Sequence, residues 1–182
     1  MPTITLIGYR GTGKSTIARL LAETLDCPWW DADVALEQRV GCSIAELVRT
    51  QGEQVFRTEE SATLVALLER TPGVLATGGG VVIRPENRAL IQARGGLVVW
   101  LTASVEVVRS RLALDPTTHS RRPALSGTDP LAEVAATMLQ REPWYREIAT
   151  LTVDTSWAPA AQVARQILDR LSTTTAFSGT RL

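Results

Sequence analysis

Short apolar stretches alternate with longer segments of helical periodicity along most of the chain. The first stretch, TITLIG (residues 3–8), is rich in β-branched residues and ends in glycine, which is typical of a buried parallel strand. In the following KSTIARLLAETL (14–25), apolar residues recur at helical spacing. Strands and helices that alternate in this way predict an α/β fold, in which helices cover both faces of a parallel sheet.

The same alternation continues to residue 171. Further strands are expected within the stretches 27–33, 73–77, 96–102 and 150–154. Helical periodicity is found in the segments 84–94, 104–114, 130–148 and 159–171. Three more helical pieces, 34–40, 43–50 and 53–70, follow one another without a strand and are separated at Gly41 and Gly52. This helical block is predicted to be an insertion before the third strand.

The length of the chain indicates one domain. Its 182 residues suit a single core, which is expected over residues 1–171. Residues 172–182 contain few apolar side chains and are expected to form a frayed tail. Residues 115–129 are rich in proline, serine, threonine and glycine, so a mobile surface loop is expected there.

Charge and composition argue against several kinds of partner. Basic and acidic residues balance at 19 each, so nothing indicates binding to nucleic acid or to an anionic membrane. The N-terminus lacks a signal-peptide pattern, and no apolar run reaches the roughly 18 residues of a transmembrane helix. We expect a cytoplasmic monomer, with Cys27 and Cys42 as free thiols and the tryptophans as packing residues.

The clearest chemical signal is GYRGTGKS (8–15), which matches G-x-x-x-x-G-K-[ST] between a predicted strand and a predicted helix. Its glycines let backbone N–H groups turn toward phosphates, which also face the positive end of the helix. Lys14 would reach the outer phosphates, and the Ser15 hydroxyl would be a ligand for Mg²⁺. Lys14 is also the only lysine, so the N-K-x-D segment with which GTPases recognise guanine is absent. ATP is therefore the expected nucleotide.

Asp31 and Asp33, in WWDADV, lie where the second strand is expected to end. Alternate residues of a strand point the same way, so both carboxylates are predicted to face the ligand-binding edge of the sheet. One would hold the water shell of the metal and the other would bind a hydroxyl group. The alternative is that one of them caps the next helix.

Arginines and glycines supply further candidates for a binding site. Arg57 lies on a predicted helix, either in a solvated ion pair or as a bidentate clamp for a substrate carboxylate. Gly78, Gly79 and Gly80 follow the third predicted strand and favour close approach of the backbone to a ligand. Arg122, in the loop 115–129, could close over the transferred phosphoryl group.

The motifs together resemble those of the shikimate kinases, small P-loop kinases of the nucleoside-monophosphate-kinase type. The resemblance extends to about Leu171 and rests on six segments in the order of that family: GTGKST, DAD, GEQVFR, LATGGGVV, RRPAL and QREPWY. It implies a three-layer P-loop NTPase fold with five parallel strands in the order 2-3-1-4-5. It also implies a substrate-binding segment at about 33–62 and a lid at about 115–129.

The activity that this resemblance implies is transfer of the γ-phosphoryl group of ATP to the 3-hydroxyl of shikimate, in aromatic amino-acid biosynthesis. Asp33 would bind the shikimate hydroxyls, as a general base or only as a positioning group. Catalysis would also involve Lys14 and Arg122, and the metal Mg²⁺ would be held by Ser15 and Asp31. The residues expected to bind ATP are Gly11, Thr12, Gly13, Lys14, Ser15, Thr16, Arg111 and Arg122. Those expected to bind shikimate are Asp33, Arg57, Gly79, Gly80 and Arg141.

Two other functions fit the same motifs. A kinase of similar build could act on another polyol acid, for example gluconate. A nucleotide-binding regulatory protein would have no small-molecule acceptor, and its aspartates and arginines would then be structural. Acceptor-dependent turnover and the effect of Asp33→Asn distinguish these possibilities from a shikimate kinase.

Overall fold

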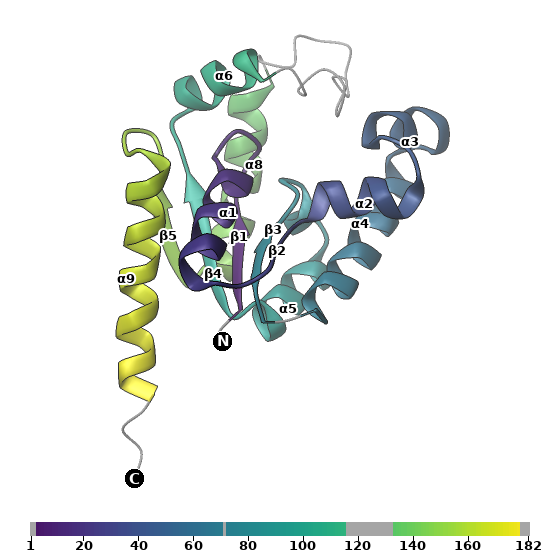
Figure 1. The fold of residues 1–182 in the computed structure, drawn as a ribbon. Coiled ribbons are helices and arrows are strands. Elements are labelled where there is room, and N and C mark those ends of the chain that lie inside the picture. The colour runs from purple at the N-terminus through teal and green to yellow at the C-terminus, as the bar shows by residue number, and fades with distance from the viewer. Residues whose placement is uncertain (1–2, 71, 116–132, 179–182) are drawn as a thin grey trace.

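The sheet consists of five parallel strands in the order β2-β3-β1-β4-β5 (Figure 1). The computed structural model describes residues 3–70, 72–115 and 133–178. The strands are β1 (Ile4–Ile7), β2 (Trp29–Asp31), β3 (Val74–Ala76), β4 (Leu97–Thr102) and β5 (Leu151–Asp154). The predicted α/β class and strand order are confirmed.

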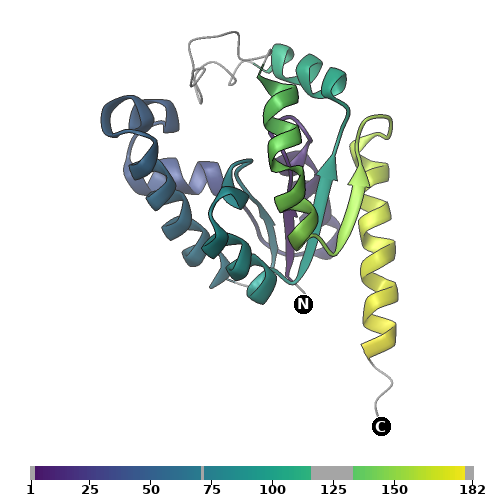
Figure 2. The same ribbon diagram turned by 180° about the vertical axis from the view of Figure 1, so that it is seen from behind.

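Helices cover both faces of this sheet, as Figures 1 and 2 show from opposite sides. On one face, α1 (Lys14–Leu25) and α9 (Ala160–Ser178) pack on the strands. On the other face lie α4 (Glu53–Leu68), α5 (Pro85–Arg94) and α8 (Val134–Ile148). The remaining helices are α2 (Ala32–Val40), α3 (Ile44–Gln51), the 3₁₀ helix η1 (Val81–Ile83) and α6 (Val105–Leu114).

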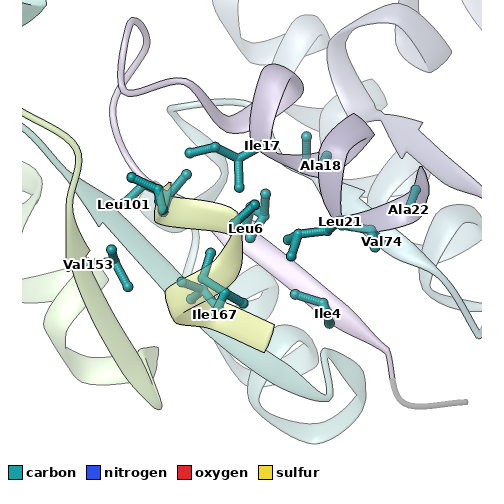
Figure 3. Packing of buried hydrophobic residues seen from close by; sticks show 14 residues of the cluster. Ile4, Leu6, Ile17, Ala18, Leu21, Ala22, Val74, Leu101, Val153 and Ile167 are labelled. Atoms are coloured by element: carbon teal, nitrogen blue, oxygen red, sulfur yellow. The ribbon is translucent and has the colours of Figure 1, made fainter. Parts of the chain in front are cut away.

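The central strand β1 explains why two layers of helices are needed. Ile4 and Leu6 point into the cluster under α1 and α9, whereas Ile7 belongs to the cluster on the opposite face. Figure 3 shows Leu6 packed between α1 residues such as Ile17 and α9 residues such as Ile167. All five side chains are buried, so β1 holds the loop that follows it on a rigid base.

The inserted helices pack as a separate unit beside the sheet. Leu36 of α2, Ile44 and Leu47 of α3, and Phe56 of α4 form a small buried cluster of their own. Gly41 and Gly52 end α2 and α3 with positive φ angles of 75° and 86°, which favour glycine. The predicted breaks in this helical block are therefore confirmed.

Three features differ from the sequence prediction or lie beyond it. Asp33 lies in the first turn of α2 and not in a strand, because β2 ends at Asp31. The short helix η1 was not expected. Helix α9 continues past Leu171 to Ser178, since no glycine or proline interrupts the chain between Pro159 and Gly179 and each added residue contributes a backbone hydrogen bond.

Other expectations concern the cysteines, the membrane and the lid. Cys27 and Cys42 are free thiols, and burial, with a contribution from Asp26, raises the pKa of Cys27.

Within the described parts of the chain, no helix combines the length and the apolar character that crossing a membrane requires. Most of the expected lid at 115–129, with Arg122, lies outside the described residues.

Candidate active site

A cavity of about 440 Å³ opens at the carboxyl ends of β1, β2 and β3. The strands are in register, with Leu6 beside Ala76 and Ala76 beside Asp31, so the segments that follow them meet at one edge. Its lining comprises Arg10, Gly11, Gly13, Lys14, Ser15, Thr16, Asp31, Asp33, Thr77, Gly79, Arg111, Leu112 and Asp115. The structure therefore brings the phosphate-loop residues and both predicted aspartates to one cavity.

The phosphate loop depends on its glycines. Gly8, Gly11 and Gly13 have positive φ angles of 139°, 78° and 91°. A Cβ atom on Gly8 would lie 2.3 Å from the carbonyl oxygen of Leu101, so no larger residue fits there. Gly13 precedes α1 and makes no side-chain cap, which leaves the first N–H groups of the helix directed at the cavity.

Lys14 is buried at the base of this loop. Its Nζ atom donates hydrogen bonds of 2.9 Å to the carbonyl oxygens of Gly8 and Tyr9. These bonds hold the ammonium group beside the N-terminus of α1, where a chain of phosphates would lie.

Asp31 serves two purposes with its two oxygens. Oδ1 accepts hydrogen bonds from the backbone N–H groups of Asp33 and Val34, at 3.0 and 3.2 Å, and so caps α2. Oδ2 accepts a 2.5 Å hydrogen bond from Ser15 Oγ. The capping alternative is therefore correct for Asp31, and it leaves the second carboxylate oxygen facing Ser15.

The Ser15 and Asp31 oxygens fit a small, hard cation. A carboxylate and a hydroxyl are the protein ligands that Mg²⁺ takes when substrate phosphates and water complete its octahedron. The described residues contain no group of three or more His, Cys, Asp and Glu side chains that could hold a metal alone. The remaining ligands of an ion bound here would come from phosphates and water.

Asp33 lines the cavity beside the triple-glycine loop, Gly78–Gly80. A Cβ atom on Gly78 would lie 2.7 Å from Asp33 Oδ1 and 3.0 Å from Glu60 Oε1. The carboxylates of Asp33 and Glu60 thus approach the same glycine from α2 and α4. Glu60 is 5% exposed, and its Oε1 atom has no hydrogen-bond partner among the described residues.

Arg57 is held in a buried ion pair. Its Nη1 atom donates a 2.7 Å hydrogen bond to Glu60, and its Nη2 atom donates one of 3.1 Å to Glu53. Burial disfavours the charge of Arg57, but the carboxylates of Glu60 and Glu53 outweigh it, so its pKa lies above the usual value. Arg57 is 7% exposed, so the prediction of a solvated ion pair is wrong.

Gly80 makes room for this arginine, which gives a first prediction. A Cβ atom on Gly80 would lie 2.2 Å from Arg57 Nη1 and 2.9 Å from its Cζ atom. Gly80→Ala should therefore displace the guanidinium and lower the free energy of unfolding by about 1–3 kcal/mol. Urea denaturation measures this loss, and steady-state kinetics should show weaker binding of the acceptor.

Gly41→Ala is the matched control for this substitution. Gly41 favours glycine because of its positive φ angle of 75°, and nothing lies within 4 Å of the position that a Cβ atom would take there. It should lower stability and leave the acceptor KM unchanged. If Gly80→Ala, like Gly41→Ala, left the acceptor KM unchanged, the position of Arg57 would not matter for binding of the acceptor.

Gly79 is the meeting point of α8 and the triple-glycine loop. Arg141 Nη1 donates a 3.0 Å hydrogen bond to the carbonyl oxygen of Gly79, and the buried Tyr145 hydroxyl donates to the same oxygen. The Arg141 guanidinium also lies 5.9 Å from the centre of the Tyr9 ring. The structure therefore groups Arg141 with Gly79, but Arg57, Gly80 and Arg141 do not line the described cavity itself. Their role in binding stays a prediction.

Arg111 connects the phosphate loop with the loop after β5. It donates to the carbonyl oxygens of Gly11 and Thr155, at 3.2 and 2.6 Å, and to Thr155 Oγ1 at 3.0 Å. Thr155 Oγ1 lies 3.1 Å and 3.0 Å from the carbonyl oxygens of Thr12 and Thr102, and its single proton can be donated to either. Thr155 was missed from the sequence, because a single threonine after a strand carries no distinctive signal.

Trp157 is an exception to the prediction that the tryptophans are packing residues. It lies on the loop after Thr155 and is 86% exposed. Trp100, by contrast, is buried and stacks with Tyr145 at a ring distance of 5.8 Å. The packing prediction therefore holds for Trp100 and is wrong for Trp157.

Comparisons with known proteins match this arrangement. The profile of the family described as shikimate kinase matches residues 10–172. A shikimate kinase from Oleidesulfovibrio alaskensis is 45% identical over 172 residues, which is 94% of this chain and 98% of that protein. A shikimate kinase from Rhodopirellula baltica is 43% identical over 163 residues, 90% of this chain and 87% of that protein.

Solved structures of related fold include a shikimate kinase. The structure described as shikimate kinase from Acinetobacter baumannii in complex with shikimate has a TM-score of 0.88 and 34% identity, covering 96% of this chain and 94% of that one. A gluconokinase from Sinorhizobium meliloti has a TM-score of 0.60 and 20% identity, covering 98% of this chain and 97% of that one. The latter similarity supports the fold alone.

Proposed function

Because the chain belongs to the shikimate kinase family, we propose that it transfers the γ-phosphoryl group of ATP to the 3-hydroxyl of shikimate. The products would be shikimate 3-phosphate and ADP. The main support for this proposal is that the phosphate loop, Asp33 and Gly79 line the same cavity. A nucleotide on the loop and a small acceptor beside Asp33 would meet there.

The donor half of the reaction would use Lys14 and the loop. Phosphoryl transfer passes through a loose transition state, so positioning and charge stabilisation supply most of the catalysis. Backbone N–H groups from Gly11 to Thr16 would bind the phosphate oxygens, and Lys14 would neutralise the outer ones. Arg111, which is already bonded to Gly11, would hold the loop in this shape.

The acceptor half would use Asp33 and two arginines. Asp33 would orient the 3-hydroxyl toward the γ-phosphorus and accept its hydrogen bond. Arg57 and Arg141 would bind the shikimate carboxylate, after Arg57 turns partly from its acidic partners or binds through its remaining donors. Arg122 would help to neutralise the negative charge of the transferred phosphoryl group, as the family resemblance implies.

Mg²⁺ is the cofactor in this proposal, and Ser15 and Asp31 would hold it. The ion would neutralise the phosphate oxygens on which charge develops. The hydrogen bond between the two residues already brings their oxygens together. We also propose a monomer that acts in the cytoplasm, in aromatic amino-acid biosynthesis.

Loss of the Ser15 hydroxyl should weaken metal use. Ser15→Ala is expected to raise the Mg²⁺ concentration needed for half-maximal rate by about tenfold or more, because one ligand oxygen is removed. A Mg²⁺ titration of the rate at fixed ATP measures this change. Ser15→Thr keeps the hydroxyl and should stay near the wild-type value; an unchanged Mg²⁺ requirement in Ser15→Ala would count against this metal site.

Binding of the acceptor can be tested apart from turnover. Calorimetric titration of the purified chain with shikimate should give saturable binding, whereas gluconate, an open-chain polyol acid, should bind at least tenfold more weakly. The reason is that Asp33, Gly79 and Arg141 are fixed on α2, the loop after β3 and α8, and suit a rigid ring. Stronger binding of gluconate would favour the second kinase function.

A further inference from the structure

Arg10 has no role in the proposed reaction so far, although it lines the cavity. It lies in the phosphate loop, directly before Gly11. Its backbone nitrogen lies 3.1 Å from the position that a Cβ atom on Gly79 would take. Arg10 therefore stands where the phosphate loop touches the triple-glycine loop, at the border between the donor and acceptor halves of the site.

No carboxylate of the described residues forms an ion pair with Arg10. In residues 3–70, 72–115 and 133–178, no ion pair or hydrogen bond involves its guanidinium, which lies 5.8 Å from the centre of the Tyr9 ring. Arg57 is paired with two glutamates, and Arg111 is bonded to backbone carbonyls. Within these parts of the chain, Arg10 is thus a cation in a cavity without an acidic partner, which suits an anion.

The position of Arg10 limits which anion it can meet. ATP phosphates would occupy the side of Lys14 and Ser15, and the acceptor would occupy the side of Asp33 and Gly79. The group that crosses from one side to the other is the transferred phosphoryl group. Its three equatorial oxygens carry charge in the transition state and remain anionic in the product.

We propose that Arg10 binds the transferred phosphoryl group, in the transition state and in the phosphorylated product. This inference rests on the proposed function. The bond between the γ-phosphorus and its bridging oxygen breaks, and that oxygen's electron pair stays with ADP. The acceptor oxygen forms its bond to phosphorus, and its proton passes to Asp33 or to water. Arg10 exchanges no atom and donates hydrogen bonds to the phosphoryl oxygens.

A competing role for Arg10 is to bind the acceptor carboxylate together with Arg57 and Arg141. The two roles predict different effects on the affinities for shikimate and for shikimate 3-phosphate. A carboxylate ligand would contribute equally to binding of shikimate and shikimate 3-phosphate, which both carry that carboxylate. A phosphoryl ligand would contribute to binding of the product and to kcat, but not to binding of shikimate.

The test compares Arg10→Met with Arg10→Lys and with Arg19→Met as the matched control. Arg19 is an exposed arginine of α1 that is paired with Glu23, so its loss removes the same charge away from the cavity. Titration calorimetry gives the Kd for shikimate and for shikimate 3-phosphate, and kinetics give kcat and both KM values.

For Arg10→Met, we expect about 10- to 100-fold weaker binding of shikimate 3-phosphate, a comparable fall in kcat, and a change of less than about threefold in the Kd for shikimate. Arg10→Lys should recover part of the loss. Equal weakening of both ligands would assign Arg10 to the carboxylate and overturn the proposal. Unchanged product affinity would overturn it as well. If the unmodified chain shows no shikimate-dependent turnover, the proposed function itself fails, and with it the role of Arg10.

Discussion

Asp33→Asn is expected to lower kcat for shikimate phosphorylation by about 100-fold or more. Asparagine keeps the shape and one oxygen acceptor, but it loses the negative charge that orients the hydroxyl and stabilises the departing proton. Binding of ATP should change little, because the substitution keeps Asp31, whose carboxylate is bonded to Ser15 of the phosphate loop. ADP release measures kcat, and nucleotide titration measures the affinity for ATP.

Glu46→Gln is the matched control for Asp33→Asn. Glu46 is an exposed acid in the first turn of α3, so its neutralisation also removes charge from a helix N-terminus. It should leave kcat unchanged. If Asp33→Asn retained full activity, Asp33 would be a structural residue. If the Asp33→Asn variant hydrolysed nucleotide at the unchanged rate and without dependence on any acceptor, a regulatory nucleotide-binding protein would be favoured.

Arg57→Ala should have two separate effects. It should raise the KM for shikimate by about 10- to 100-fold and leave the KM for ATP nearly unchanged, because the carboxylate clamp is lost. It should also lower the free energy of unfolding by about 3–5 kcal/mol, because it leaves Glu60 buried without its partner. Initial-rate kinetics and urea denaturation measure the two effects.

A double variant separates binding from stability at this position. Arg57→Ala combined with Glu60→Gln removes the unpaired charge, so it should recover part of the lost stability. It should not restore the KM for shikimate. Equal increases in the KM for shikimate and for ATP would contradict the assignment of Arg57 to the acceptor.

The parts of the site that could be predicted from the sequence have local causes. The loop from Gly8 to Ser15 needs particular residues at fixed spacing, and its strand and helix follow from the periodicity on either side. The breaks at Gly41 and Gly52 likewise depend on backbone angles that only a few residues adopt readily. Such features are visible in a short window of sequence.

Asp33 shows where a short window misleads. A D-x-D pair has the spacing of two residues on one face of a strand, so a strand is the natural prediction for both. In the structure, the Asp31 side chain accepts two backbone N–H groups and starts α2, which places Asp33 in a helix. The predicted proximity to the site was correct although its structural reason was not, because the first turn of α2 lies at the same edge of the sheet.

Glu60 depends on contacts that are distant in the chain. Its burial results from packing of α4 on the sheet and on the triple-glycine loop. One signal was present: Glu60 lies on the same helical stripe as Phe56, Leu64 and Leu67, where a charged residue is out of place without a partner. Tyr145 and Thr155 carried no comparable signal, because their partners, Gly79 and Thr12, lie far away in sequence.

The central claim is that this chain phosphorylates shikimate, and the most direct test is the rate of ADP release from Mg²⁺-ATP with and without shikimate. Gluconate serves as the control acceptor, and ³¹P spectroscopy of the product identifies the oxygen that carries the phosphate. We expect turnover that depends on shikimate and yields a single 3-phosphate, with little turnover on gluconate. Turnover on gluconate alone, or ADP release that is indifferent to any acceptor, would contradict the claim.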